Sequence, residues 1–339
     1  MGGIVLRFNL SGAFFIAFLA LTAVMGVLYL RVTLADAETP AVADLLRGTW
    51  TPEFEASLDR ALPVNTLSRA LWGRAEYALF GQGRKGVIAG NDGWLFTDEE
   101  FTCPHHYARN LQDNLAVVSA TQARLKAAGI KLVVILVPAK ARLFPRIKLP
   151  ACRTSLYADI RAAMKLDNIS VADLLTVLKP QSFFKTDTHW TPDGARIAAQ
   201  AAARSMPRGT QSFLTISGVE KTHEGDLLRY VPGVIFAPET FVPYATEAAT
   251  SGNLFGDAPA PAIVLAGTSY SANADWNFAG FLKQYLKADV LNVAAEGHGP
   301  FTVMADYLES DAWKNAPPRF IVWEMPERYF LSPSGRIAK

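Results

Sequence analysis

The sequence predicts an α/β fold: a doubly wound parallel sheet with helices on both faces, preceded by one N-terminal transmembrane helix. Three features indicate this fold. Short, continuous apolar runs are typical of buried parallel strands, and segments with helical spacing separate them. Strands that alternate with helices favour parallel neighbours within one sheet. The third feature is a long uncharged segment near the N-terminus.

The composition is that of a globular chain with a large core. Of its 339 residues, 50% are hydrophobic and 19% are charged, so disorder is not expected over most of its length. The formal net charge is only +2, and no block of lysine and arginine stands out. A nucleic-acid-binding surface usually needs such a basic patch, so no nucleic-acid partner is expected.

The N-terminal residues 1–31 are predicted to be a membrane anchor. Leu10–Leu30 is a run of 21 residues without a formal charge, which is enough to cross a bilayer core. Ala35-Asp36-Ala37 is similar to a signal-peptide cleavage site, but Arg31 separates it from the apolar run. We therefore expect an uncleaved anchor. Arg7 favours a cytoplasmic N-terminus, which leaves the rest of the chain outside the cytoplasm.

Residues 32–75 are predicted to form a tether and leading helices, and residues 76–339 the main domain. Apolar residues at helical spacing on both sides of Pro63 indicate short helices. Residues 86–96 are typical of a hairpin, with Asn91-Asp92-Gly93 as its turn. The main domain is therefore expected to open with a hairpin.

The alternation of strands and helices then continues through the chain with one interruption. The predicted strands are Lys131–Val137, Ile169–Asp173, Ala262–Ala266, Ala288–Val293 and Phe320–Trp323. The predicted helices are Leu111–Ala128, 154–165, Ala195–Ser205, Trp276–Leu286 and Phe301–Leu308. Residues 206–258 lose the alternation and are predicted to be an irregular, β-rich insertion.

Cys103 and Cys152 are the two cysteines of the chain. Outside the cytoplasm they are able to form a disulfide, which would close a loop worth roughly 4 kcal/mol. The sequence does not show whether their Cα atoms are close enough, so two free thiols stay an alternative. His105 and His106 lie near Cys103, but the spacing matches no zinc-binding pattern. No metal is expected.

Three segments concentrate reactive side chains, and the first is Gly267-Thr268-Ser269-Tyr270-Ser271. It directly follows a predicted strand, and ligands of open α/β sheets bind beyond the carboxyl ends of the strands. Ser269, near a glycine that permits a tight turn, is well placed as a nucleophile. Ser271, two residues farther from the strand, is the alternative nucleophile. A helix after it would add backbone N–H groups for an oxyanion. An ordinary turn with a capping serine is the alternative.

The second segment is Asp187-Thr188-His189-Trp190. In extended backbone, residues i and i+2 point to the same side, so Asp187 and His189 are able to reach into one cleft. A serine hydroxyl needs a base to take its proton, and the base needs a partner that holds its tautomer. The alternative is a helix-capping aspartate beside a surface histidine.

The third segment, Trp323 to Tyr329, follows the last predicted strand and gathers two acids, an arginine and a tyrosine. Its simplest interpretation is a surface ion pair of Glu324 or Glu327 with Arg328. Two further histidines are less informative. His298 stands between two glycines whose backbone N–H groups are suited to an oxyanion, but an ordinary loop histidine is the simpler interpretation. His223 falls in the insertion and has no motif around it.

Taken together, six segments resemble the AlgJ/AlgX family of alginate O-acetyltransferases, which have an SGNH (GDSL-like) hydrolase fold. The matching segments, in family order, are 90–96, 137–140, 186–192, 267–271, 297–300 and 323–329. They cover roughly residues 55–335. The resemblance depends on the Asp-Thr-His-Trp and Gly-Thr-Ser-Tyr-Ser motifs occurring in this order, because each motif alone is common.

The resemblance implies that Ser269 is the nucleophile, His189 its base and Asp187 the residue that orients the base. The residues expected to hold the oxyanion or the substrate are Gly267, Tyr270, Gly297, His298, Gly299, Arg328 and Tyr329. A histidine at position 298 stands where a cation would grip an acidic sugar. The polymer is therefore left open between alginate, cellulose and another exopolysaccharide. A single-domain layout, without a C-terminal carbohydrate-binding module, is expected.

The resemblance also implies a ping-pong transfer without a cofactor. Ser269 takes an acetyl group from a donor, and a sugar hydroxyl deprotonated by His189 then accepts it. The implied partners are an exopolysaccharide acceptor and a multi-spanning membrane O-acyltransferase that delivers the acetyl group. The implied location is the inner membrane, through residues 10–30, with the domain in the periplasm.

Two other functions fit the same residues. A polysaccharide acetyl-esterase would use the same three side chains with water as the acceptor. A non-catalytic scaffold of an exopolysaccharide export complex would keep the fold and would not need the chemistry. The presence of Asp187, His189 and Ser269 together favours an enzyme.

Overall fold

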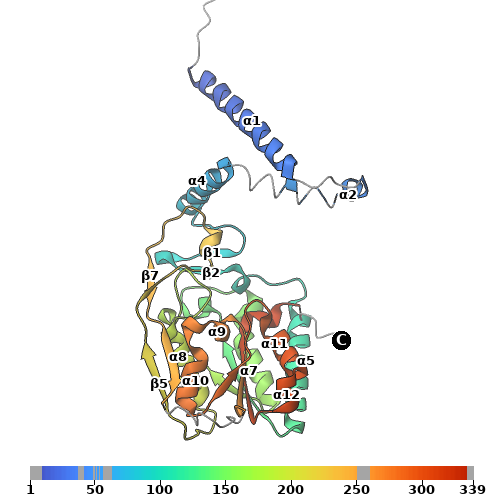
Figure 1. Ribbon diagram of the computed structural model, residues 1–339, viewed down its shortest axis with the longest axis vertical. Coiled ribbons are helices and arrows are strands. Elements are labelled where there is room, and N and C mark those ends of the chain that lie inside the picture. The colour runs from blue at the N-terminus through green and yellow to red at the C-terminus, as the bar shows by residue number, and fades with distance from the viewer. Residues whose placement is uncertain are drawn as a thin grey trace, which may run out of the picture. The chain divides into compact units, whose positions relative to one another are not determined.

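The computed structural model describes residues 10–36, 42–48, 50, 52, 54–55, 63–249 and 260–333. The chain divides into two compact units. The first comprises residues up to 80 together with 232–234, and the second comprises residues 81–231 and those from 235 onward. Figure 1 shows their elements along the chain.

The first unit begins with the 27-residue helix α1 (Leu10–Asp36). Its segment Gly12–Arg31 is long and apolar enough to cross a membrane, and its large apolar side chains are exposed. The predicted transmembrane helix is thus present as a candidate span. A short helix, α2 (Val42–Arg47), lies within the predicted tether. Next comes α4 (Pro63–Phe80), which starts at its proline. The helix predicted before Pro63 lies mostly outside the described residues.

The second unit is built around five parallel strands in the order β10-β9-β11-β3-β4. Their bounds are β3 (Lys131–Val137), β4 (Ser170–Asp173), β9 (Ile263–Ala266), β10 (Val290–Asn292) and β11 (Phe320–Pro326). Among the described residues the last strand is β11, which lies at the centre of the sheet, between β9 and β3. All seven of its residues are buried there. It therefore continues beyond the predicted end at Trp323 and contains Glu324.

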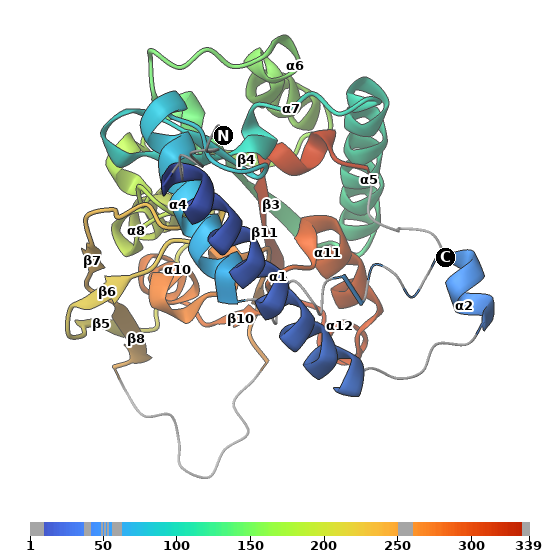
Figure 2. The same cartoon turned by 90° about the horizontal axis from the view of Figure 1, so that it is seen from above.

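Helices cover both faces of this sheet (Figures 1 and 2). They are α5 (Tyr107–Ala127), α6 (Ala151–Thr154), α7 (Leu156–Leu166), α8 (Pro192–Ala203), α9 (Ser269–Ala272), α10 (Phe278–Leu286), α11 (Gly299–Glu309) and α12 (Asp311–Asn315). Successive side chains of a strand point to opposite faces. Accordingly, Val133 and Ile135 join a core with α8 and α10, whereas Leu132 and Val134 join a core with α5, α7 and α11. The predicted doubly wound fold is confirmed.

The predicted hairpin is also present. Its strands are β1 (Val87–Ala89) and β2 (Leu95–Thr97), paired antiparallel. The turn at Asn91–Gly93 places Asp92 at φ 56° and Gly93 at φ 78°, a left-handed conformation that aspartate tolerates and glycine favours. The backbone N–H of Leu95 donates to the carbonyl of Lys185 at 2.8 Å. The hairpin is thereby joined to the segment that carries Asp187.

The insertion after α8 contains two small antiparallel sheets. One pairs β5 (Phe213–Ser217) with β8 (Tyr244–Ala248), and the other pairs β6 (Lys221–His223) with β7 (Glu239–Phe241). The β-rich character predicted for this region is confirmed up to residue 249, and residues 250–259 lie outside the described part. At Gly225 an added Cβ would lie 2.1 Å from the carbonyl oxygen of Thr186. The insertion therefore approaches the segment before Asp187 at backbone distance.

Cys103 and Cys152 form a disulfide, with their Cα atoms 5.9 Å apart. Next to it, Arg153 donates from Nε and Nη2 to the carbonyl of Thr102, at 3.2 and 3.1 Å. The bond and the guanidinium together fasten α6 to the segment that follows β2. The alternative of two free thiols is wrong.

Candidate active site

Ser269 lies at the carboxyl end of β9, where the chain turns into α9. The residue before it, Thr268, is the N-cap, and its hydroxyl accepts the backbone N–H of Tyr270 at 3.4 Å. At Gly267 an added Cβ would lie 2.6 Å from Oε2 of Glu324, so a glycine lets the turn pass over this carboxylate. The helix predicted after the serine is a single turn of four residues.

His189 joins Ser269 to Asp187 through its two ring nitrogens. Its Nε2 lies 2.6 Å from Oγ of Ser269, and its Nδ1 lies 2.6 Å from Oδ1 of Asp187. Because a carboxylate only accepts hydrogen bonds, Nδ1 carries the proton and Nε2 is free to accept the serine proton. The side chain of His189 is 15% exposed and that of Asp187 only 5%. The His189 side chain is thus partly accessible to solvent, whereas that of Asp187 is shielded.

The neighbours of His189 and Ser269 fix the two segments to each other. The indole N–H of Trp190 donates to the carbonyl of Tyr270 at 3.1 Å, and the phenol of Tyr270 donates to the carbonyl of Thr188 at 2.5 Å. Trp190 and Tyr270 are buried. Two bonds therefore cross from one segment to the other directly beside the contact between base and serine.

Asp187 is surrounded by four donors. Oδ1 accepts the backbone N–H of His189 at 2.8 Å as well as its ring N–H. Oδ2 lies 2.9 Å from Nε2 of His223 and 3.1 Å from the backbone N of Asp226. Burial by itself raises the pKa of Asp187, but the hydrogen bonds from His189 and His223 outweigh it and hold the pKa far below its ordinary value. Asp187 is therefore an anion.

A buried lysine supports the same segment from the side of β3. Nζ of Lys140 donates to the carbonyls of Phe184, Lys185 and Asp187 at 3.0, 3.2 and 2.7 Å. Burial lowers the pKa of Lys140 to about 8, although the charges of Glu100 and Asp187 act to raise it. The Glu100 carboxylate in turn accepts the backbone N–H of Lys140 at 2.9 Å.

The two glutamates of the third predicted segment do not pair with Arg328. Glu324 lies inside β11, where its carboxylate accepts the N–H and hydroxyl of Thr268 and the hydroxyl of Ser271. Glu327 pairs with Arg142 at 2.9 Å. The predicted surface ion pair is wrong because both carboxylates point into the protein. Since the Ser271 hydroxyl is committed to Glu324, Ser269 is the serine that faces the histidine.

Arg328 contacts the rings of both Tyr270 and Tyr329. The Arg328 guanidinium carbon is 5.7 Å from the ring centre of Tyr270 and 5.2 Å from that of Tyr329. Its Nε lies 2.9 Å from a carboxylate oxygen of Glu99. A role for Tyr270, Arg328 and Tyr329 in binding substrate stays a prediction.

The loop after β10 reaches the serine turn by a backbone bond, because the N–H of Ala295 donates to the carbonyl of Gly267 at 3.2 Å. Farther along this loop, Gly297 and Gly299 have φ values of 75° and 70°, and an added Cβ at Gly299 would lie 3.4 Å from the ring of Tyr329. The exposed His298 lies 2.8 Å, through Nδ1, from the carbonyl of Glu296. The predicted oxyanion role of this loop stays a prediction.

Asp187, His189 and Asp226 place three possible metal-ligand atoms within 4.8 Å of one another. The same groups are engaged in hydrogen bonds. Nδ1 of His189 is bound to Asp187, and the Asp226 carboxylate accepts the N–H and the hydroxyl of Thr188 at 2.8 and 2.6 Å. The geometry favours a hydrogen-bonded base over a ligand set, since a metal would have to displace these bonds.

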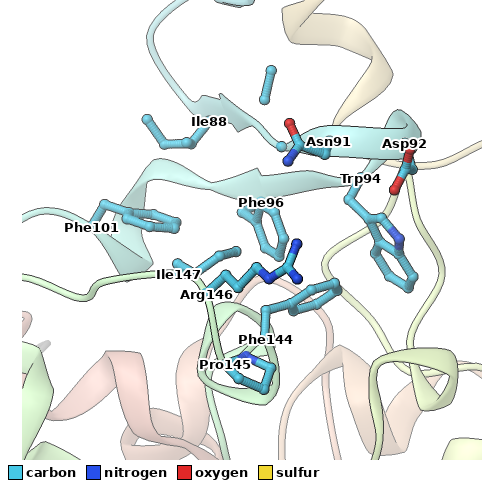
Figure 3. A pocket seen from close by; sticks show the side chains of 12 residues that line it. Ile88, Asn91, Asp92, Trp94, Phe96, Phe101, Phe144, Pro145, Arg146 and Ile147 are labelled. Atoms are coloured by element: carbon cyan, nitrogen blue, oxygen red, sulfur yellow. The ribbon is translucent and has the colours of Figure 1, made fainter.

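A cavity of about 470 Å³ lies between the β1–β2 hairpin and the segment that follows β3 (Figure 3). The rings of Trp94, Phe96 and Phe144 line it together with Arg146. Neither Ser269, His189 nor Asp187 is among its lining residues. Nζ of Lys140 lies 5.5 and 5.2 Å from the ring centres of Trp94 and Phe96. Through Lys140 the wall of the cavity and the segment that carries Asp187 are in contact with one another.

The doubly wound parallel sheet defines the class of the fold, an α/β domain of the SGNH hydrolase-like type, and Ser269, His189 and Asp187 form a hydrogen-bonded chain at the end of one of its strands. A family model described as "SGNH hydrolase-like domain, acetyltransferase AlgX" matches residues 87–327. The chain belongs to this family of SGNH hydrolase-like domains.

Individual relatives are similar over most of the chain. A protein of Pseudomonas fluorescens named "Probable alginate O-acetylase AlgJ" is 40% identical over 337 residues, which cover 92% of this chain and 85% of that protein. A protein of the same name from Pseudomonas aeruginosa is 41% identical over 326 residues, with coverages of 87% and 82%. The solved O-acetyltransferase domain of Pseudomonas putida AlgJ superposes with a TM-score of 0.69 at 36% identity, covering 74% of this chain and 94% of that domain.

Proposed function

We propose that this protein is an O-acetyltransferase that moves acetyl groups through a serine acyl-enzyme to hydroxyl groups of an alginate-like bacterial exopolysaccharide. The observation that carries the proposal is the contact of 2.6 Å on each side of the His189 ring, to Ser269 and to Asp187. Membership of the acetyltransferase family and the names of the AlgJ relatives support the choice of acetyl group and acceptor.

The geometry supports the following steps. Oγ of Ser269 attacks the carbonyl carbon of the acetyl donor while Nε2 of His189 takes the hydroxyl proton, and the imidazolium then gives that proton to the leaving group. A sugar hydroxyl next loses its proton to Nε2 and attacks the acyl-enzyme, which releases the acetylated sugar and restores the Ser269 hydroxyl. Asp187, kept anionic, stabilises the imidazolium in both halves. We assign the oxyanion to backbone N–H groups beside Ser269 and in the loop 297–299.

The acetyl donor is proposed to reach Ser269 from a multi-spanning membrane O-acyltransferase. The proposed location is the inner membrane, with α1 as a single-pass anchor and the second unit in the periplasm. The apolar segment Gly12–Arg31 supports the anchor, and the Cys103–Cys152 disulfide supports an oxidising compartment. Protease added to spheroplasts should digest the second unit. Full protection there, with digestion only after lysis, would rule out the periplasmic location.

Intact-protein mass spectrometry of the full chain in detergent tests the acyl-enzyme. After incubation with an activated acetyl ester, wild type should gain about 42 Da, the mass of one acetyl group on a serine nucleophile, and Ser269→Ala should not. Ser205→Ala, at an exposed serine outside the site, is the matched control and should be labelled like wild type. Equal labelling of Ser269→Ala and wild type would exclude Ser269 as the nucleophile.

The acetyl content of the polymer distinguishes an acetyltransferase from an esterase. With an acetyl donor and unmodified polyuronate, wild type should raise the acetyl content of the polymer, whereas an esterase would lower the acetyl content of an acetylated polymer. A scaffold predicts that Ser269→Ala leaves acetylation intact in cells. Net acetate release from the polymer, or unchanged acetylation by Ser269→Ala, would overturn the proposed transfer.

A further inference from the structure

Residues 185–189, which we call the triad loop, contain Asp187 and His189. Side chains of the insertion form hydrogen bonds with the backbone of this loop. The Glu239 carboxylate, on β7, accepts the backbone N–H groups of Lys185 and Thr186 at 2.6 and 2.8 Å. The Asp226 carboxylate accepts the backbone N–H of Thr188 at 2.8 Å. Side chains of the insertion therefore bind backbone groups on both sides of Asp187.

His223 reaches Asp187 itself. It is the last residue of β6, and its Nε2 lies 2.9 Å from Oδ2 of Asp187. Because the carboxylate only accepts, Nε2 of His223 is the donor. Asp187 is thus shared by two imidazoles: Oδ1 serves His189, and Oδ2 serves His223.

The ring of His223 is itself held in place. It stacks on Phe184 with ring centres 3.9 Å apart and an interplanar angle of 26°. Phe241 and Trp276 meet it nearly edge-on, with ring centres at 5.9 and 5.6 Å. The side chain is 10% exposed. Three aromatic rings therefore limit the directions in which its N–H is able to point.

Oδ2 of Asp187 has two donors, and Nε2 of His223, at 2.9 Å, lies closer to it than the backbone N–H of Asp226, at 3.1 Å. A carboxylate bound only through Oδ1 is free to rotate about its Cβ–Cγ bond, and each rotation changes the direction of the hydrogen bond to His189. Donors on both oxygens fix the plane of the carboxylate. The His189 ring is then oriented with Nε2 on Ser269, at 2.6 Å.

We propose that His223 is a positioning residue for acyl transfer: its Nε2–H fixes the Asp187 carboxylate so that His189 keeps the tautomer and orientation that accept the Ser269 proton. This inference rests on the proposed function, because it assigns a further residue to the same site. His223 acts through Asp187, on the side of the carboxylate away from His189. The cost of its loss should therefore fall on kcat and leave KM nearly unchanged, because misplacing a catalytic group by about 1 Å costs about 100-fold in rate.

Two substitutions separate the hydrogen bond from the packing. His223→Phe keeps a ring that stacks on Phe184 and removes the N–H. His223→Gln removes the ring and keeps an N–H donor at about the place of Nε2. His105→Gln, at an exposed histidine beside His106, is the matched control. All are made in the full chain and assayed in detergent for hydrolysis of an aryl acetate, with circular dichroism to show that each is folded.

We expect kcat of His223→Phe to fall by about 10- to 100-fold with KM within about twofold. His223→Gln should stay within about fivefold of wild type, and His105→Gln should match it. If His223→Phe is not folded, His223→Asn, whose amide is too short to reach Asp187, replaces it with the same expected loss. If kcat of His223→Phe, or of His223→Asn in its place, were the same as in wild type, the inference would be overturned. Equal losses in His223→Phe and His223→Gln would overturn it too, because they would assign His223 to packing.

The two proposals fail in different ways. Wild-type protein without turnover and without an acyl adduct would overturn the proposed function, and the role of His223 with it. Wild-type turnover together with full activity of His223→Phe would overturn the role of His223 alone.

Discussion

Oε2 of Glu324, in the middle of the sheet, accepts the backbone N–H of Thr268 at 2.7 Å. The same carboxylate accepts the hydroxyls of Thr268 and Ser271. The residues on both sides of Ser269 are thus bound to one fully buried acid, without a lysine or arginine within ion-pair distance in the described part of the chain. The turn that contains Ser269 is thus fixed by hydrogen bonds to the Glu324 carboxyl group, whose charge depends on pH.

The first prediction concerns stability. Burial raises the pKa of Glu324 from 4.5 to about 7, although its hydrogen bonds from Thr268 and Ser271 act to lower it. Between these values the folded protein binds one more proton than the unfolded chain. The free energy of unfolding should therefore fall as the pH rises from about 4.5 to about 7, by up to about 3 kcal/mol, and level off above.

Glu324→Gln is uncharged at every pH, so its free energy of unfolding should lack the pH dependence that Glu324 causes. Melting temperatures measured from pH 5 to pH 8 should converge at the acid end and separate towards the alkaline end, with wild type lower there. Glu247→Gln, at an exposed glutamate on β8, should follow wild type throughout. If the melting temperatures of wild type and Glu324→Gln changed in parallel with pH, the raised pKa of Glu324 would be contradicted.

The second prediction concerns the carboxylate that orients the base. In Asp187→Asn the amide should place an N–H against Nδ1 of His189, which favours the wrong tautomer. The expected loss in kcat is about 10³- to 10⁴-fold. Asp226→Asn, which keeps an acceptor for the Thr188 N–H, should lose less than about tenfold. Aryl acetate hydrolysis measures both, and similar kcat values for the two variants would argue against a special role of Asp187.

The third prediction separates activity from stability at Lys140. Replacing it with methionine removes a donor from the carbonyls of Phe184, Lys185 and Asp187, and only that of Lys185 keeps another one, the N–H of Leu95. The substitution also removes the cost of a buried charge, since burial lowers the pKa of Lys140 to about 8. These effects oppose each other at about 1–3 kcal/mol each. The free energy of unfolding should thus change by about 1 kcal/mol or less.

The triad loop of Lys140→Met should nevertheless be less well fixed, and kcat should fall by about tenfold or more. Urea unfolding and aryl acetate hydrolysis are measured on the same preparation. Lys148→Met, at an exposed lysine, is the control. If Lys140→Met unfolded at a lower urea concentration than wild type but kept the wild-type kcat, the positioning role of Lys140 would be refuted.

The fourth prediction concerns the disulfide. Cys103 and Cys152 are separated by 49 residues, so their bond should contribute about 4 kcal/mol by restricting the unfolded chain. Cys103→Ser combined with Cys152→Ser should lower the melting temperature by several degrees and leave kcat nearly unchanged below it. A reductant should produce the same shift in wild type and none in the double variant. A wild-type melting temperature that is insensitive to reductant would show that the bond contributes little.

The main elements of the sheet were predictable from the sequence because each strand is a continuous apolar run. The run Lys131–Val137 predicts β3 at both ends. The prediction for β11 stopped at Trp323, since Glu324 interrupts the apolar pattern, whereas the structure buries this acid beneath a turn that lies 53 to 57 residues earlier in the chain. Glu324 is stable inside the strand because it binds Thr268, which is distant in the chain. A pattern of neighbouring residues carries no information about such a contact.

The contact of His189 with Ser269 and Asp187 was predictable because each of their segments has a local signature. Ser269 directly follows a strand, and Asp187 and His189 stand two residues apart before a helix cap. The residues that support the triad were not identified, because His223, Asp226 and Glu239 lie on short strands and loops without periodicity. The resemblance included Lys140 in a motif, but no pattern in the sequence marks a lysine as buried.

The position of β11 has a consequence for the order in which the molecule assembles. Chain synthesis runs from the N-terminus, so all residues of the triad, and the insertion that holds the triad loop, are made before the strand that joins the two halves of the sheet. Until β11 inserts, β3 with β4 and β9 with β10 are separate ribbons with open edges. A nascent chain that ends before residue 320 therefore carries Ser269, which follows β9, and His189, which follows β4, on parts of the sheet that β11 has not yet joined.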